Sequence, residues 1–297
     1  MKVAVIGTGY VGLVSGVCLA SKGHDVVCLD KNEFIVNSLN SGKPTIHEKD
    51  LNELLEFVVE QKRFFVTQDL EVALSGASVI IIAVGTPSHN GEIDLTNVLE
   101  ATKEIGTYIS SKNQFVSIIV KSTVIPGTTD TQVLEVLEKS SKKSLGDFGL
   151  GMNPEFLREG NAIDDFMNPD RIVLGFEDDK TLSFLEELYM PWNVEKIKVN
   201  SRTAELIKYA NNSILATQIS TINEIANLAN EVGKIDMNEV VKGIHLDKRW
   251  NPIIKNSRLN PEILNYLRPG CGFGGSCFTK DIQAIKAQGK KFNLPMN

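Results

Sequence analysis

A cysteine near the end of the chain stands in a pattern that could do covalent chemistry. Cys277 follows a glycine-rich run that starts at Gly270, and Lys280 and Asp281 come within four residues after it. Glycine lets the backbone take positive φ and approach a ligand closely. A helix predicted over residues 280–288 would place Cys277 near a helix N-terminus, where the dipole and the free N–H groups favour a thiolate. The alternative is a buried, inert cysteine beside a tight turn.

The N-terminal segment has the pattern of a dinucleotide-binding unit. Gly7 would make a tight turn, Gly9 would let a pyrophosphate reach the backbone, and Gly12 would let a helix pack on a strand. Asp30 lies 18 residues after Gly12, where it suits a ribose 2′-hydroxyl and would repel a 2′-phosphate, which predicts NAD rather than NADP. The elements predicted around these residues are strand 2–6, helix 13–21 and strand 25–29.

Polar residues follow several other apolar runs. Thr86 comes after the run 79–84, Thr123 after 116–120, and Glu155 after 149–152. Each could be a simple loop or helix cap. Because the carboxyl ends of parallel strands meet at one edge of a sheet, we expect these side chains and Asp30 to line one shared pocket.

The second half of the chain is predicted to be helical. Residues 203–232 contain no proline and no internal glycine, and apolar residues recur every three or four positions. Such a helix, at roughly 1.5 Å per residue, is about 45 Å long, which suits a spine between domains or a subunit contact. Lys208 and Asn212 are four residues apart and so share one face of it. A solvated polar face is the alternative interpretation of that pair.

Composition and cysteine usage define the class of protein. Because the net charge is −6 and there is no basic run, we expect no binding to nucleic acid or to membrane surfaces. The sequence has no apolar run of 18 residues, so we expect no membrane span. The four cysteines lack zinc-like spacing, so we expect no metal site. A disulfide scaffold is implausible in a chain of this size, which favours reduced thiols and a cytoplasmic location. We expect an α/β fold. A Rossmann-type, doubly wound, mostly parallel sheet over 1–198 would precede an all-helical central domain over 199–297.

Taken together, the motifs resemble the UDP-glucose/GDP-mannose dehydrogenase family, nearest to members that oxidise UDP-glucose. They are the segments 7–12, 84–87, 121–124, 153–160, Lys208 with Asn212, and 272–281, in the family's order. The resemblance implies a two-step, four-electron oxidation of a nucleotide sugar's primary alcohol to a carboxylate with two NAD⁺. It also implies a homodimer built on the long helix, in which Arg249 reaches the neighbouring subunit's site.

The resemblance assigns roles to individual residues. Cys277 would capture the aldehyde as a thiohemiacetal, which is oxidised to a thioester. Lys208 and Asn212 would stabilise the oxyanion, and Lys208 would favour the thiolate. The catalytic residues implied are Cys277, Lys208, Asn212, Asp281, Glu155 and Thr123. The cofactor residues implied are Gly7, Gly9, Tyr10, Val11, Gly12, Asp30, Lys31, Gly85, Thr86, Pro87, Ser122, Thr123, Glu159 and Lys280. The substrate residues implied are Glu155, Phe156, Leu157, Arg158, Glu159, Lys208, Asn212, Arg249, Tyr266, Leu267, Arg268, Gly272, Phe273 and Gly274.

The sequence is compatible with other substrates and other roles. The sugar nucleotide could be UDP-glucose, UDP-N-acetylmannosamine or GDP-mannose. A two-electron β-hydroxyacid-type dehydrogenase also pairs a Rossmann domain with a long helix bearing Lys and Asn, and it needs no thiol. The family carries a third domain that binds the nucleotide of the substrate, and the 297 residues end about where that domain would begin. We therefore expect NAD binding but weak substrate binding and little activity from this chain by itself, as in a non-catalytic, dimerising fragment.

Overall fold

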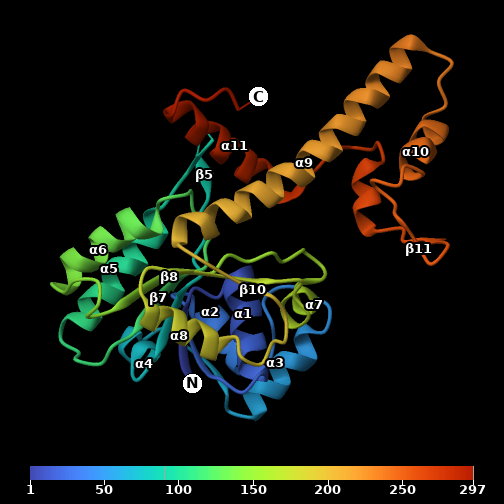
Figure 1. Ribbon diagram of the computed structural model, residues 1–297. Helices are drawn as coiled ribbons and strands as arrows, with labels where there is room; N and C mark the ends of the chain where they lie inside the picture. Colours follow the sequence, from blue (N-terminus) through green and yellow to red (C-terminus); the bar gives the residue numbers. More distant parts are fainter. Residues whose placement is uncertain (90, 297) are drawn as a thin grey trace. The chain divides into compact units, whose positions relative to one another are not determined.

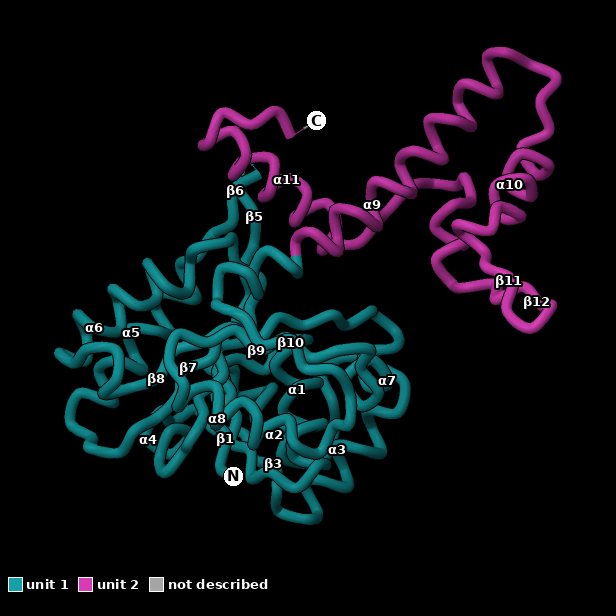
Figure 2. The backbone as a smooth tube through the Cα atoms, viewed as in Figure 1, with its two compact units in different colours: residues 1–208 teal, residues 209–297 magenta. Residues whose placement is uncertain are grey.

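The computed structural model describes residues 1–89 and 91–296, and the chain divides into two compact units. Unit 1 comprises Met1–Lys208 and unit 2 comprises Tyr209–Asn297 (Figure 2). The division falls inside one helix, α9 (Ser201–Val232), so its first residues belong to unit 1 and the rest to unit 2. The domain boundary near residue 198 stays a prediction.

Unit 1 is built on one sheet of eight strands (Figure 1). The strand order is β10-β9-β8-β7-β4-β1-β2-β3, and every neighbouring pair is parallel except β8 with β9. The order departs from β1 in both directions, which is the doubly wound arrangement predicted from the glycine loop and the buried apolar runs. The strands are β1 (Lys2–Ile6), β2 (Asp25–Leu29), β3 (Phe64–Thr67), β4 (Val79–Ile82), β7 (Ser117–Val120), β8 (Gly149–Met152), β9 (Ile172–Phe176) and β10 (Lys196–Val199).

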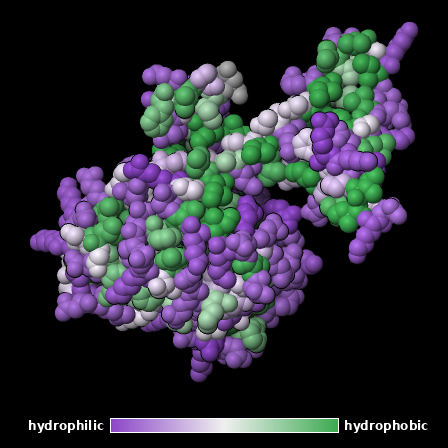
Figure 3. All heavy atoms as spheres, in the orientation of Figure 1, coloured by the Kyte–Doolittle hydropathy of each residue, from purple (hydrophilic) through white to green (hydrophobic). Residues whose placement is uncertain are grey.

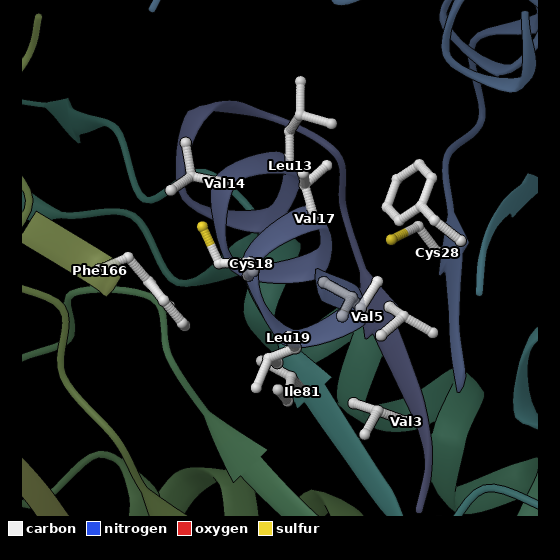
Figure 4. Packing of buried hydrophobic residues seen from close by; sticks show 14 of the residues in the cluster. Val3, Val5, Leu13, Val14, Val17, Cys18, Leu19, Cys28, Ile81 and Phe166 are labelled. Atoms are coloured by element: carbon white, nitrogen blue, oxygen red, sulfur yellow. The ribbon is translucent and has the colours of Figure 1, made fainter. Parts of the chain in front are cut away.

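Successive side chains of a strand point to opposite faces of the sheet, so each face presents apolar side chains. Helices cover both faces. On β1, Val3 and Val5 belong to one hydrophobic cluster, whereas Ala4 and Ile6 belong to the other. Figure 4 shows the first cluster, in which Cys18 and Cys28 are buried among apolar side chains. The helices of unit 1 are α1 (Tyr10–Ser21), α2 (Glu33–Asn40), α3 (Leu51–Glu60), α4 (Leu70–Leu74), α5 (Thr96–Ser110), η1 (Thr129–Val133), α6 (Leu134–Ser141), α7 (Ala162–Met167) and α8 (Asp179–Leu188).

Local sequence explains where several of these helices begin. Asn32, Asp69 and Asp178 each accept a hydrogen bond from a backbone N–H in the first turn of the helix that follows. These side chains satisfy amides that have no partner within the helix. A short hairpin of β5 (Ser88–His89) and β6 (Glu92–Ile93) precedes α5.

Unit 2 is helical apart from one small hairpin. It contains the rest of α9, then α10 (Met237–His245), β11 (Ile253–Ile254) paired with β12 (Ser257–Arg258), the 3₁₀ helix η2 (Glu262–Leu267) and α11 (Gly275–Lys291). Figure 3 shows apolar residues gathered at the surface of this unit around α9 and α10. Among the residues described, no helix has the length and apolar character needed to cross a bilayer. The fold class is therefore confirmed: a mostly parallel α/β sheet followed by a helical part with one long helix.

Candidate active site

The glycine loop between β1 and α1 has the steric features of a dinucleotide site. A Cβ at Gly12 would lie 1.9 Å from the carbonyl oxygen of Gly7, so only glycine allows this packing of helix on strand. Gly7 has φ +95°, a value that favours glycine. A Cβ at Gly9 would meet nothing within 4 Å, and Gly9 is the N-cap of α1 with no side-chain capping bond. The space and the free amides there fit a pyrophosphate.

Asp30 is held at the end of β2, beside the same loop. Its Oδ2 accepts a hydrogen bond from the backbone N–H of Thr8 at 3.1 Å and another from the Thr8 hydroxyl. Its Oδ1 accepts from the N–H of Asn32 at 2.9 Å. A carboxylate fixed this way next to the phosphate loop suits a ribose hydroxyl. Lys31 points elsewhere, because its ammonium pairs with Glu104 at 3.1 Å and its side chain is largely exposed.

The turns after β4 and β7 are joined to each other. The hydroxyl of Thr86 donates to the backbone carbonyl of Thr123 at 2.9 Å, and the hydroxyl of Ser122 donates to the carbonyl of Val84 at 2.6 Å. Strands β4 and β7 are parallel neighbours, so their carboxyl ends meet at the same edge of the sheet. Thr86 and the backbone of Thr123 thus lie together at this edge, whereas the shared pocket stays a prediction. Gly85 leaves open space for a Cβ, so the backbone is accessible at this turn.

A buried ion pair lies at the end of β8. The ammonium of Lys208, on α9, is 2.8 Å from Oε1 of Glu155, and the two side chains are 6% and 9% exposed. Phe156 packs beside them, with the Lys208 ammonium 5.5 Å and the Arg171 guanidinium 3.9 Å from its ring centre. The N–H of Leu157 donates to the other oxygen of Glu155 at 2.7 Å. Two residues predicted to be catalytic, 53 positions apart in the chain, are thus in contact.

Lys121 is a second buried cation next to this pair, and we gave it no role from the sequence. Its ammonium donates to Oδ1 of Asn153 at 2.8 Å, and that amide donates to the carbonyl of Val173 at 2.8 Å. Burial lowers the pKa of Lys121 to about 8, although the charge of Glu155 opposes the change. The signal was a lysine directly after a fully apolar strand, where a charged side chain must find a partner.

Glu205 is another buried carboxylate that the sequence analysis missed. It is fully buried on α9 and accepts from the N–H groups of Gly127 at 2.6 Å and Thr129 at 2.9 Å. Burial raises the pKa of Glu205 to about 7, although the hydrogen bonds from Thr129 and Gly127 act in the opposite direction. Its position, three residues before Lys208 in the same helix, was the available signal.

In unit 2, Asn212 and Asp281 form a buried hydrogen bond. The amide of Asn212, on α9, donates to Oδ2 of Asp281 at 2.7 Å, and the two residues are 6% and 1% exposed. The other oxygen of Asp281 lies 3.0 Å from the ammonium of Lys280. Asp281 belongs to α11, which begins at Gly275, and Cys277 is exposed in the first turn of that helix. The position of Cys277 near a helix N-terminus agrees with the sequence; its orientation toward a nicotinamide stays a prediction.

The glycine-rich segment before α11 is also tied to α9 at its beginning. The backbone N–H of Gly270 donates to Oδ1 of Asn223 at 2.9 Å. Gly272 and Gly275 have φ of +89° and +74°, values that other residues rarely take. Asn223 and Asn212 therefore hold the two ends of the segment that carries Cys277.

The remaining residues implied for the sugar nucleotide are spread over both units. Leu157 packs against the core of unit 1, whereas Arg158 and Glu159 are exposed. Arg249 is exposed after α10 and pairs with Asp247 at 2.5 Å. In and after η2, Tyr266 is half-buried, Leu267 is buried and Arg268 is exposed. Their contacts with a substrate stay predictions.

The chain matches models of one protein family over nearly its whole length. Residues 1–193 match the NAD binding domain of the UDP-glucose/GDP-mannose dehydrogenase family, and residues 202–297 match the central domain of the same family. The chain is 43% identical over 298 aligned residues to UDP-glucose 6-dehydrogenase TuaD of Bacillus subtilis, covering 99% of the chain and 61% of that protein. It is 38% identical to GDP-mannose 6-dehydrogenase of Pseudomonas aeruginosa, covering 99% of the chain and 65% of that protein.

The fold is shared with solved structures of related enzymes. A UDP-glucose dehydrogenase from Pyrobaculum islandicum superposes with a TM-score of 0.89 at 38% identity, over 99% of this chain and 65% of that one. The chain thus spans less than two thirds of the length of these relatives. Both of its units match consecutive parts of one family, and the residues that prompted the resemblance lie in those parts. The chain therefore belongs to the UDP-glucose/GDP-mannose dehydrogenase family and contains its NAD binding domain and its central domain.

Proposed function

We propose that the protein carrying this chain oxidises the C6 alcohol of UDP-glucose to the carboxylate of UDP-glucuronate, through covalent intermediates on Cys277. Relatives at 40–43% identity are named UDP-glucose 6-dehydrogenases. The observation that carries the proposal is a pair of buried contacts made by α9, Lys208 with Glu155 in unit 1 and Asn212 with Asp281 in unit 2. These are the groups that proton transfer and oxyanion stabilisation require.

The glycine loop, Asp30 and the Thr86 turn would hold NAD⁺, which supplies the hydride acceptor for each of the two oxidations. Glu155 would accept the alcohol proton, directly or through a water molecule. The thiolate of Cys277 would then add to the C6 aldehyde, and the new oxyanion would be stabilised by Lys208 and Asn212. After the second oxidation the carbon is a thioester. Water positioned by Thr123 and Asp281 would cleave the carbon–sulfur bond and release the acid and the thiol.

The test is steady-state turnover by the whole protein with UDP-glucose, GDP-mannose and UDP-N-acetylmannosamine, each with NAD⁺. We expect turnover with UDP-glucose and two NADH per sugar oxidised. Cys277→Ser should stop net acid formation, because without the sulfur the aldehyde has no nucleophile to return it to an oxidisable state. One NADH per sugar, or full acid formation by Cys277→Ala, would refute the thioester route and favour a two-electron dehydrogenase. NAD⁺ binding with no turnover of any sugar would favour a non-catalytic role.

We also propose that the protein is a homodimer through α9. Ile214, Leu228 and Val232 are 60%, 64% and 65% exposed, and Ile225 is 39% exposed. At 3.6 residues per turn these four side chains fall within roughly 60° of one another around the helix, so they form one apolar stripe. An exposed stripe of this kind on a long helix suits pairing with a second copy.

The unpaired thiols of Cys18, Cys28 and Cys271 favour a cytoplasmic location.

Sedimentation of the purified chain tests the dimer. We expect a dimer mass for the wild type and a monomer for Leu228→Lys, since a charge on the stripe would be buried in the interface without a partner. Met190→Lys is the control, because Met190 is 73% exposed in unit 1 and lies outside α9. A monomeric wild type, or a Leu228→Lys chain that still dimerises, would contradict this interface.

A further inference from the structure

A buried carboxylate, Glu48, connects two parts of unit 1 that are far apart in the chain. Glu48 lies in the loop between α2 and α3 and is 6% exposed. Its Oε1 accepts a hydrogen bond from the hydroxyl of Tyr10 at 2.6 Å and another from the backbone N–H of Gly160 at 2.7 Å. Its Oε2 accepts from the N–H of Ala162 at 3.1 Å. No motif in the sequence singled out Glu48.

The three donors belong to two segments to which the proposed function assigns different ligands. Tyr10 is the first residue of α1 and belongs to the glycine loop that would hold the pyrophosphate. Gly160 and Ala162 end the segment that starts at Glu155, and Ala162 begins α7. Gly160 has φ +86°, so the backbone reverses sharply where it meets the carboxylate. Glu48 thus bridges the cofactor loop and the end of the Glu155 segment, beside a longer direct bond from the Tyr10 hydroxyl to the carbonyl of Arg158 at 3.3 Å.

The carboxylate is held in its ionised form by this arrangement. Burial opposes ionisation, but the hydrogen bonds from Tyr10, Gly160 and Ala162 outweigh it and lower the pKa of Glu48 below its ordinary value. Conversely, burial and the bond to Glu48 raise the pKa of Tyr10, so its hydroxyl keeps the proton that it donates. Charge-assisted hydrogen bonds of this kind are stronger than neutral ones. A glutamine could accept from fewer of the three donors, since its amide nitrogen accepts none.

We propose that Glu48 is a positioning residue that makes cofactor binding at the glycine loop and the geometry of the Glu155–Gly160 segment depend on each other. The proposal rests on the proposed function, in which that segment faces the sugar nucleotide. Glu48 itself touches neither ligand in this scheme. It acts through the Tyr10 hydroxyl on one side and through two backbone amides on the other.

A double-mutant cycle in the 297-residue chain tests this coupling. NAD⁺ affinity is measured by calorimetry for wild type, Glu48→Gln, Tyr10→Phe and the double variant. We expect Glu48→Gln to weaken NAD⁺ binding about tenfold, as for loss of a hydrogen bond to a charged group. The double variant should bind within about twofold of Glu48→Gln alone, because both changes remove the same link. Glu60→Gln is the control, since Glu60 is exposed on α3 and should leave the affinity unchanged.

Hydrogen exchange at the amides of Gly160 and Ala162 gives the second readout. We expect Tyr10→Phe to speed exchange at both amides severalfold, although the substitution lies 150 residues away in the chain from Gly160. Losses of NAD⁺ affinity that multiply in the double variant, or unchanged exchange in Tyr10→Phe, would overturn the proposal. If Glu48→Gln does not fold, exchange at Ala162 in Tyr10→Phe decides, because the Ala162 amide bonds to Glu48, whereas Tyr10 also bonds directly to the carbonyl of Arg158 near Gly160. Neither measurement contains a sugar, so failure of UDP-glucose turnover would refute the proposed function and leave this coupling intact.

Discussion

The ammonium of Lys208 lies 2.8 Å from the carboxylate of Glu155, and both side chains are almost completely buried. A buried ion pair is costly to form, but it is more costly to break by removing one partner, since the other charge is then left without compensation. We expect Lys208→Met to lower the free energy of unfolding by about 3 kcal/mol. Urea denaturation at pH 7 measures the change.

The double variant Lys208→Met, Glu155→Gln provides the comparison. It leaves no buried charge at this position, so we expect it to be more stable than Lys208→Met alone even though it carries one more substitution. Lys242→Met with Glu239→Gln is a matched control, because this pair is exposed on α10. Surface ion pairs contribute about 0–1 kcal/mol. Additive effects in the buried pair would show that the two charges do not stabilise each other.

Gly9 and Gly12, two of the three glycines of the cofactor loop, should respond in opposite ways to substitution by alanine. Gly9→Ala should fold like the wild type, because a Cβ there meets nothing within 4 Å, yet it should weaken NAD⁺ binding by about tenfold or more by occupying the pyrophosphate's space. Gly12→Ala should destabilise the fold itself, because its Cβ would lie 1.9 Å from the Gly7 carbonyl oxygen. Thermal melting and calorimetry of both variants separate these effects. Unchanged NAD⁺ affinity in Gly9→Ala would argue against the assigned pyrophosphate position.

Much of the architecture followed from local pattern. The run at 79–82 is apolar throughout because β4 is buried on both faces, and the helix expected over 203–232 is α9, Ser201–Val232. The glycine loop was predictable since each glycine has its own steric reason. The antiparallel pairing of β8 with β9 was not, because the periodicity of an apolar run does not encode strand direction.

The missed site residues share a physical cause. Glu48, Lys121 and Glu205 are ordinary charged residues in the sequence, and their burial depends on donors and acceptors that are distant in the chain. Glu48, for example, meets amides more than 110 positions away. Such pairings have no periodicity, whereas capping residues such as Asn32 and Asp178 act within three residues of themselves. The resemblance to a family supplied Lys208 and Asn212, whose spacing alone did not distinguish a site from a solvated face.

The segment that carries Cys277 should loosen separately at each end. Asn223→Ala removes the bond to the Gly270 amide, so we expect hydrogen exchange at Gly270 to accelerate by up to about tenfold, the value of one hydrogen bond. Asn212→Ala should instead accelerate exchange in the first turns of α11, near Asp281. Mass spectrometry of peptic peptides measures both. Asn230→Ala, an exposed asparagine on the same helix, is the control. Equal acceleration across the segment in both variants would mean that it opens as one unit.

Glu205 makes the stability of unit 1 depend on pH in a defined direction. Burial raises the pKa of Glu205 from 4.5 to about 7 in the folded chain, whereas in the unfolded chain it returns to its ordinary value. The stabilising contribution is therefore fully present below about pH 4.5 and is lost as the pH rises through about 7. A difference of this size corresponds to about 3 kcal/mol.

The variant Glu205→Gln cannot titrate, so it should lack this loss. We expect the stability of the wild type relative to Glu205→Gln to fall by about 3 kcal/mol between pH 4 and pH 8, because the folded wild type must then bury a charge. Urea unfolding at four or five pH values measures the difference in unfolding free energy between the two proteins. The contributions of the other titratable groups are common to both and cancel in this difference. Glu60→Gln, an exposed substitution, should show a flat difference over the same range. A flat difference for Glu205→Gln as well would mean that the N–H groups of Gly127 and Thr129 compensate the buried charge completely.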